Sequence, residues 1–520
     1  MTALGPAPVS GSILPTMSRA VTFALVLAFA TGCGSDPAPA PNPGNAATQA
    51  TGWYRGDLHF HTNYSEDAKR QGGDDLGQAL LIADAWRAPV WVKAHPDWTG
   101  DGLDFIEVSD HRTAAALQDP AFHSDHLIVI PGEEYGDTGH ANTIGIRAFV
   151  DQVPAAGQSK NDHTLAAIAA THAQGALFSV NHPCQYNRWM WGTDGIDGVE
   201  VWNGPWMGFF GETTEADFEA EAQETGIHND YIQGAVAHSG GGANEQALWF
   251  WYGMLTRGYH PALLGGSDRH MIVPPAVPTT YVEKPGDAAF AKLSGKALGY
   301  QGIVAGIRAG ATFVSSSPHG PQVLLEAVDG KGVHHRMGSE LAAGTSYTID
   351  FTVTRASGGL LQLVGGDVVP GSGPVTPAPK VLDQWSLTRD IVTGTYVWQV
   401  PAGGAWLHAV VLAPRIPTPL PAELDPVVKA LSVLPPQGKS VGAIVQVLGV
   451  IVDPNVLFDP KECDPAKWDP FLADCMPADT TTWATFYFPT PLLHLMNTYF
   501  VDGQPTKWSM GALSSAFLAK

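Results

Sequence analysis

The chain is 520 residues long, with 44% hydrophobic and 15% charged residues, a balance typical of a folded globular protein of two or three domains. Its 50 Asp and Glu residues outnumber 28 Lys and Arg, which gives a formal net charge of −22 at pH 7. Such an acidic surface repels phosphate backbones and argues against nucleic-acid binding. A small-molecule substrate attracted to a local site remains compatible with this charge.

Residues 1–33 have the features of a bacterial export signal. The apolar run from Val21 to Ala30 is too short to span a bilayer, and Arg19 supplies the preceding positive charge. Met1 and Met17 both remain candidate starts. We therefore expect the protein to be exported.

The signal ends at Ala30-Thr31-Gly32-Cys33, which resembles a lipobox and predicts a lipid anchor on Cys33. A plain secretory signal with an incidental cysteine is the alternative. Residues 34–52 are rich in Pro, Ala, Asn and Gly and predict a flexible linker. The expected location is the cell envelope, either in the periplasm or at the cell surface.

Residues 53–318 alternate predicted strands with predicted helices. Asp74 or Asp75 is the expected N-cap of the first helix. Alternation of this kind indicates an α/β fold with a parallel sheet, most simply a distorted TIM-like barrel. The predicted strands include 105–108, 127–130, 176–180, 199–202 and 261–265, and the predicted helices include 74–86, 163–173, 244–257 and 303–309.

Five motifs that carry metal-binding side chains each follow a predicted strand. They are Asp57-Leu58-His59-Phe60-His61-Thr62, Ser109-Asp110-His111, Gly132-Glu133-Glu134 with Gly139-His140, Asn181-His182-Pro183 and Gly266-Ser267-Asp268-Arg269-His270. In an extended segment His59 and His61 point the same way, about 6–7 Å apart at the backbone. The carboxyl ends of barrel strands open on one face, so the motifs predict a shared metal centre there.

Together these motifs resemble the PHP (polymerase and histidinol phosphatase) superfamily over roughly residues 53–318. Further stretches resemble its carbaryl-hydrolase-like (CehA/McbA) branch. These are Gly139-His140-Ala141-Asn142-Thr143-Ile144-Gly145, Glu200-Val201-Trp202-Asn203-Gly204, Pro278-Thr279-Thr280-Tyr281-Val282, and Ile307 to Phe313 leading to Gly320-Pro321. The resemblance implies a (β/α)7 barrel that holds two or three divalent metal ions.

Carried over by position, the resemblance assigns three sets of ligands. The first comprises His59, His61, Glu134 and Asp268; the second comprises Glu134, His140 and His182; the third comprises Asp67, His111 and His270, with Asp268 open to sharing. Glu66 is an alternative to Asp67, and Glu133 is an alternative to Glu134. Mixed imidazole and carboxylate donors suit Zn, Mn or Fe without selecting among them.

The ligand set implies hydrolysis by a metal-bound hydroxide of a phosphoester, ester, carbamate or amide bond. The expected catalytic residues are Glu134 and Asp268 at the metals, and His238 as a proton donor to the leaving group. Arg112 and Arg269 are candidates to hold an anionic substrate group, with salt-bridge partners as the alternative role. Asp57 and Asp110 are candidates either to orient ligand imidazoles or to cap the local backbone.

The pattern changes after residue 318. Short strands between Gly, Pro and Asp turns predict a β-sandwich-like domain at 319–415. Residues 416–520 begin with a Pro-rich stretch and form an extension without an assigned role. In an exported chain Cys463 and Cys475 are expected to form a disulfide, which leaves Cys184 either as a buried apolar residue or as a soft metal ligand.

The leading hypothesis is therefore an exported PHP-type metallohydrolase that acts on a small molecule. The alternative is a catalytically weak ligand-binding lipoprotein on the same scaffold. Neither the natural substrate nor the oligomeric state follows from the sequence.

Overall fold

A computed structural model describes most of the chain between residues 52 and 520. The described ranges are 52–70, 73–85, 103–136, 139–185, 188–204, 213–237, 242–270, 275–283, 299–318, 320–414, 498–501 and 504–520. The export signal with Cys33, the linker up to residue 51, His238, and the cysteine pair 463 and 475 lie outside these ranges. Within them, no helix is both long and apolar enough to cross a membrane.

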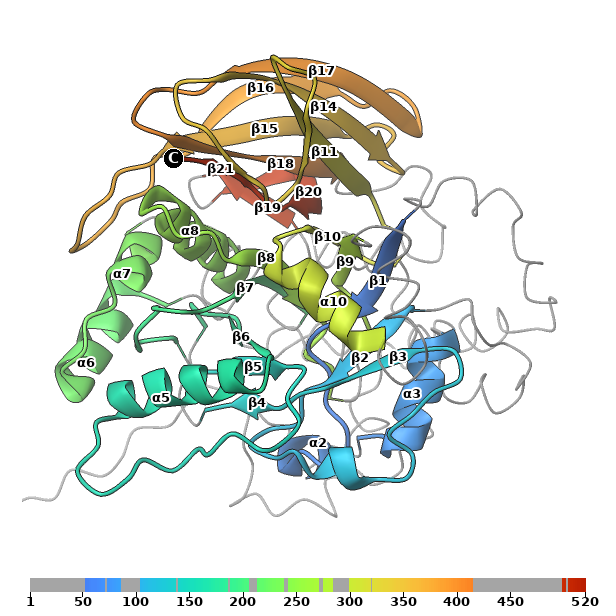
Figure 1. The fold of residues 1–520 in the computed structure, drawn as a ribbon, viewed down its shortest axis with the longest axis vertical. Coiled ribbons are helices and arrows are strands. Elements are labelled where there is room, and N and C mark those ends of the chain that lie inside the picture. The colour runs from blue at the N-terminus through green and yellow to red at the C-terminus, as the bar shows by residue number, and fades with distance from the viewer. Residues whose placement is uncertain are drawn as a thin grey trace, which may run out of the picture.

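The first sheet begins with three parallel strands and continues with two antiparallel ones. In order along the chain these are β1 (Trp53–Asp57), β2 (Phe105–Val108), β3 (Ile128–Pro131), β9 (Thr279–Glu283) and β10 (Thr312–Ser315). Every residue of β2 is buried, as expected for a strand covered on both faces. Helices α3 (Leu76–Ala85) and α10 (Gly299–Arg308) flank this sheet (Figure 1).

A second sheet has the order β4-β5-β6-β7-β8. Its first two pairings are antiparallel and the next two are parallel. The strands are β4 (Glu134–Tyr135), β5 (Ala141–Ile144), β6 (Leu177–Val180), β7 (Gly198–Asn203) and β8 (Ala262–Gly266). The accompanying helices are α5 (Lys160–Ala173), α6 (Glu215–Thr225), α7 (Asp230–Val236) and α8 (Ala243–Thr256).

Isolated bridges connect the ends of these two sheets. One pairs Phe60 with Arg269 and the other pairs His111 with Glu134, so both lie beside predicted ligands. The mixed α/β class is confirmed. The hydrogen bonds found in the described ranges do not by themselves close the two sheets into one ring, and the (β/α)7 barrel stays a prediction.

The β-rich region packs two layers around an apolar core that includes Ile349, Phe351 and Leu363. One layer has the order β12-β11-β14-β17, and the other includes β13, β15, β16 and β18. The strands are β11 (Gln322–Asp329), β12 (His334–Arg336), β13 (Glu340–Leu341), β14 (Ser346–Thr354), β15 (Leu360–Asp367), β16 (Lys380–Ser386), β17 (Ile391–Gln399) and β18 (Ala405–Pro414). Alternating burial along β14 agrees with the predicted sandwich-like packing.

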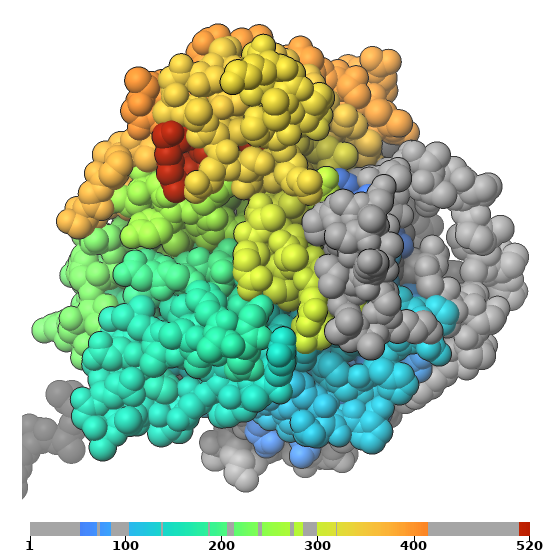
Figure 2. Space-filling model, in the orientation of Figure 1, coloured from blue at the N-terminus to red at the C-terminus, as the bar shows by residue number. Residues whose placement is uncertain are grey.

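The end of the chain belongs to this architecture. The structure adds β19 (Thr498–Val501), β20 (Gln504–Ser514) and β21 (Phe517–Ala519). Strand β20 lies between β10 and β18 and pairs antiparallel with both, so one continuous sheet joins the two regions. Figure 2 shows the β-rich region, in yellow to orange, in direct contact with the residues below it. The last residues of the expected 416–520 extension are thus strands of the main sheet.

Candidate metal centre

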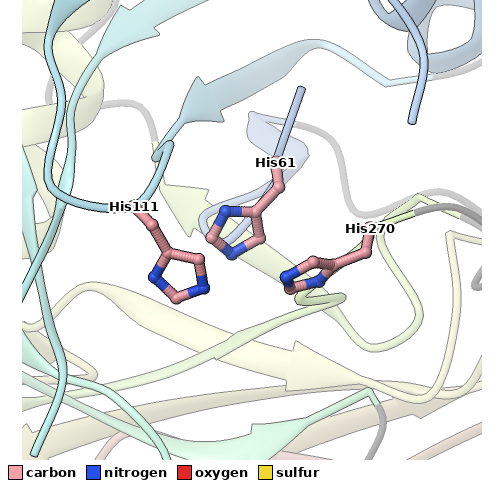
Figure 3. Close-up of side chains that lie close together, drawn as sticks. All are labelled: His61, His111 and His270. Carbon is pink, nitrogen blue, oxygen red and sulfur yellow. The ribbon is translucent and has the colours of Figure 1, made fainter. Parts of the chain in front are cut away.

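All nine predicted ligands converge on one region, and Figure 3 shows three of them, His61, His111 and His270, close together. They reach it from the ends of several strands and from α2 (Glu66–Arg70), which carries Asp67. Four overlapping groups have ligand atoms within 4.8 Å of one another: His59, His61 and Glu134; His111, Glu134 and His140; His59, His182 and Asp268; and His61, His111 and His270. The predicted gathering of these side chains is therefore present in the structure.

Glu134 lies at the centre of the cluster. Its Oε1 is 3.2 Å from His59 Nε2, 3.1 Å from His140 Nδ1 and 3.3 Å from His182 Nε2. Its Oε2 is 2.7 Å from His111 Nδ1 and 3.5 Å from His61 Nε2. Because its two oxygens face different imidazoles, the Glu134 carboxylate has the arrangement of a bridge between two cations.

Two aspartates complete the cluster on its other side. Asp67 Oδ2 is 3.1 Å from His111 Nε2 and 3.0 Å from His270 Nε2. Asp268 Oδ1 is 3.1 Å from His61 Nε2 and 3.5 Å from His270 Nδ1. Glu66, the alternative to Asp67, is exposed and belongs to none of the candidate metal groups.

The spacing of the donor atoms fits bound cations. His59 Nε2 and His61 Nε2 face each other at 3.1 Å. Two imidazole lone pairs at this distance need a proton or a cation between them. Two nitrogen ligands of one tetrahedral zinc ion lie about 3.3 Å apart, given Zn–N bonds of about 2.0–2.1 Å. The His59–His61 pair is therefore spaced like two ligands of a single ion.

The charge states of the carboxylates also suit metal binding. Burial would raise the pKa of Glu134, but His140, His111 and His59 hold it well below its usual range. Asp268 likewise has a pKa held well below its usual range, because His59 and His61 outweigh its burial. Burial, together with the nearby His270 and His111, lowers the pKa of His61 to about 3, whereas Glu134 and Asp67 outweigh burial at His111 and raise its pKa to about 10. Ionised carboxylates and neutral imidazoles are the forms that bind divalent metals.

Hydrogen bonds behind the ligands orient His61 and secure the neighbouring backbone. His61 Nδ1 lies 2.9 Å from Ser65 Oγ, which donates to Asp110 Oδ1 at 2.8 Å. Asp110 thus acts on the imidazole through Ser65 rather than directly. Asp57 accepts hydrogen bonds from the backbone N–H groups of His59, Ser267 and Ala276. Of the two roles considered for Asp57, these contacts fit capping of the local backbone.

Two ligands sit in strained backbone conformations. His182 has a φ of 26° and Asp268 has a φ of 46°, a region that non-glycine residues seldom adopt. Such strain persists only where the surroundings hold it, and it gathers at functional sites. The positive φ at both positions therefore supports a functional role for the His182 and Asp268 side chains.

Comparisons with models of known protein families, with curated proteins and with solved structures found no match. The support for a function of this site therefore comes from the geometry of its side chains and from the motifs in the sequence.

The other predicted site residues have different surroundings. Arg112 is exposed and lines a surface cavity of about 510 Å³ together with Arg147 and Phe149. Arg269 is buried, pairs with Asp74 at 2.5 Å and lies over the Phe60 ring. The ion pair of Arg269 agrees with the structural role considered for it.

Glu133 and Cys184 do not join the cluster. Glu133 accepts hydrogen bonds from Val150 N and Gln152 Nε2, away from the ligands. Cys184 is buried as a free thiol and belongs to no candidate metal group among the described residues. These placements favour Glu134 over Glu133 and the packing role over the ligand role for Cys184.

Sequence reasoning gave no role to Glu200, which contacts a ligand directly. Its Oε1 lies 3.0 Å from His59 Nδ1, on the side of the ring opposite the cluster. Gln185 contacts His182 Nδ1 at 2.6 Å in a comparable way. Glu200 begins the stretch Glu200 to Gly204, one of those that resemble the CehA/McbA branch. That resemblance was the feature of the sequence that could have pointed to it.

Proposed function

We propose that the protein is a metal-dependent hydrolase of the PHP type, which cleaves a phosphoester, ester, carbamate or amide bond of a small molecule. The observation that carries this proposal is the Glu134 carboxylate, whose two oxygens face separate sets of imidazoles. The motif resemblance supports the same conclusion and, with it, a distorted (β/α)7 barrel as the scaffold.

The side chains would divide the work as follows. His59, His61, His140, His182 and Asp268 hold cations on the buried side, and Asp67, His111 and His270 hold them on the outer side. Glu134 sets the distance between the two sides. Bound divalent ions would lower the pKa of a coordinated water and polarise the oxygen of the bond under attack. Zn, Mn and Fe all suit this mixture of donors.

Among the described residues, Asp67, His111 and His270 are the most exposed ligands, ahead of His140 at 11% and Asp268 at 12%. The side chains of Asp67, His111 and His270 are 14%, 16% and 19% exposed, whereas those of His61 and His182 are 0% and 2% exposed. Substrate and water are therefore expected to approach from the side of Asp67, His111 and His270.

A surface cavity that begins at Arg112, the residue after His111, suits an anionic group of the substrate, and no metal ligand lines this cavity. Arg112 and Arg147 line the same cavity, and Phe149 adds an apolar wall that is 48% exposed. Guanidinium groups recognise phosphate and carboxylate oxygens by paired hydrogen bonds. The proposed role of Arg112 is to hold such a group, whereas the contacts of Arg269 suit positioning of the loop that carries Asp268.

The test combines metal analysis with a substrate panel. Purified protein should contain Zn, Mn or Fe and should hydrolyse p-nitrophenyl phosphate or p-nitrophenyl acetate. Glu134→Ala should lose both bound metal and turnover, because it removes the ligand shared by the two sides. Full metal loading without turnover on any substrate would favour the ligand-binding lipoprotein instead. Retention of metal and rate by the Glu134 variant would contradict the assignment.

The export signal and the lipid anchor on Cys33 belong to the same proposal. They concern where the hydrolase works and do not affect the chemistry of the cluster.

A further inference from the structure

Glu200 is a buried carboxylate that uses both of its oxygens on predicted metal ligands. It lies in β7 and is 3% exposed. Its Oε1 is 3.0 Å from His59 Nδ1, and its Oε2 accepts a hydrogen bond from His182 N at 3.1 Å. These two ligands follow different strands, β1 and β6, so Glu200 links segments that are far apart in the chain.

Asn203, three residues along the same strand, extends this contact to a third ligand. Its Nδ2 donates to Glu200 Oε2 at 3.1 Å and to Asp268 Oδ2 at 3.2 Å. The backbone N–H of Asn203 donates to Asn244 Oδ1, and Asn244 Nδ2 donates back to the Asn203 carbonyl, both at 3.0 Å. Helix α8, which carries Asn244, thereby fixes the position of Asn203.

The chemistry of these contacts determines what they do to the ligands. A carboxylate at His59 Nδ1 keeps the proton on that nitrogen, which leaves the lone pair of Nε2 directed into the cluster. The bond to His182 N holds the residue whose φ is 26°, and the bond to Asp268 holds the residue whose φ is 46°. The ligand atoms of these same three residues lie within 4.8 Å of one another.

We propose that Glu200 and Asn203 form a positioning pair that sets the metal affinity of the His59, His182 and Asp268 side of the centre. The inference rests on the proposed metal centre but does not require that the centre be catalytic. Neither residue touches His111 or His270 in the described contacts. The pair therefore acts on one side of the cluster and leaves the outer side unchanged.

Glu200→Gln tests the pair with little change in shape. If the amide nitrogen faces His59, the imidazole loses its proton acceptor and no longer favours a free Nε2. If the amide nitrogen faces His182 N and Asn203 Nδ2 instead, donors meet donors and that contact is lost. In either orientation the affinity of the inner Zn²⁺ site should fall about 10- to 100-fold, the usual effect of losing such a partner.

The measurement is calorimetric titration of metal-free protein with Zn²⁺, supported by the visible absorption of bound Co²⁺. The wild type should show more than one binding step. Glu200→Gln should weaken one step and leave the step assigned to Asp67, His111 and His270 unchanged. Asn203→Ala should weaken the same step by a smaller factor, and it carries the test if Glu200→Gln does not fold.

Glu133→Gln is the matched control, because Glu133 is a similarly buried carboxylate beside a ligand, but among the described residues its side chain accepts from Val150 N and Gln152 Nε2 instead of from ligands. Its Zn²⁺ titration should match that of the wild type. The proposal is overturned if folded Glu200→Gln and Asn203→Ala bind Zn²⁺ as the wild type does, or if all binding steps weaken together. A wild type that binds none of Zn²⁺, Mn²⁺ and Fe²⁺ would instead refute the proposed function.

Discussion

Two adjacent glutamates show how position along a strand decides the chemistry of a residue. Glu133 and Glu134 have the same side chain, but neighbouring residues of an extended segment point to opposite faces. Glu134 faces five imidazoles and stays ionised. Burial raises the pKa of Glu133 to about 8, although the bonds from Val150 and Gln152 partly oppose the shift. Only Glu134 is therefore prepared to bind cations.

Cys184 provides a prediction at the residue scale. Burial raises the pKa of its thiol well above the usual range, and the thiolate is the form that binds metals. Cys184→Ala should leave the metal content unchanged and should lower the free energy of unfolding by roughly 1 kcal/mol, as a small loss of core packing. Elemental analysis and urea denaturation measure the two effects. Loss of a metal equivalent in this variant would show that the sulfur is a ligand after all.

The ligands could be predicted from the sequence, but most of their supporting partners could not. His59 and His61 are recognisable from their spacing, and His111, His182 and Asp268 from their place after predicted strands. Glu200 bonds to His59 across 141 positions of the chain, and no local pattern encodes that contact. Ser65 is the exception, since it lies only four residues after His61 and was within reach of a local argument.

At the scale of elements, strongly periodic segments were predicted well. The helix expected at 163–173 is α5, which begins earlier because Ser159 caps it by accepting from Asp162 N. Asp75 rather than Asp74 caps α3, the helix expected at 74–86, through a bond from Gln78 N, while Asp74 pairs with Arg269. The antiparallel strands β4 and β5 were not predicted, because they are only two and four residues long and lack an apolar run.

Strand β20 provides a prediction at this scale. It supplies backbone partners to both β10 and β18, so its removal would expose two sheet edges at once. A chain that ends before residue 504 should fail to fold or should aggregate, and both regions should lose their cooperative unfolding transition. Circular dichroism and sedimentation of the truncated protein measure this outcome. A soluble truncated chain with an intact transition would show that β20 is dispensable.

At the scale of the whole molecule, a buried aromatic contact joins the two regions in addition to the continuous sheet. Tyr252 of α8 and His408 of β18 meet at 2.8 Å between the hydroxyl and Nε2, and Trp406 stacks on Tyr252. His408 is fully buried, and burial lowers its pKa to about 3, against a small opposing effect from the Ser514 backbone. The folded protein therefore holds this histidine in its neutral form.

A pH dependence of stability follows from this contact. Between about pH 6.5, the ordinary pKa, and about 3, the unfolded chain binds a proton at His408 that the folded chain does not. The free energy of unfolding should therefore fall as the pH decreases through this range, by up to about 1.4 kcal/mol per pH unit from this group. His408→Gln should lose this part of the slope.

Urea denaturation of the wild type and of His408→Gln at pH 7 and pH 5 isolates the effect, since all other titrating groups are shared by the two proteins. Parallel pH dependences would mean that His408 is not held neutral by its burial.

The central claim is that residues from five separate motifs hold divalent cations around the Glu134 carboxylate. The most direct measurement is the anomalous diffraction of zinc in crystals of the Zn²⁺-loaded protein. We predict at least two peaks, one near Glu134 with His59 and His61, and one near Asp67, His111 and His270. A map without anomalous density between these side chains would contradict the account.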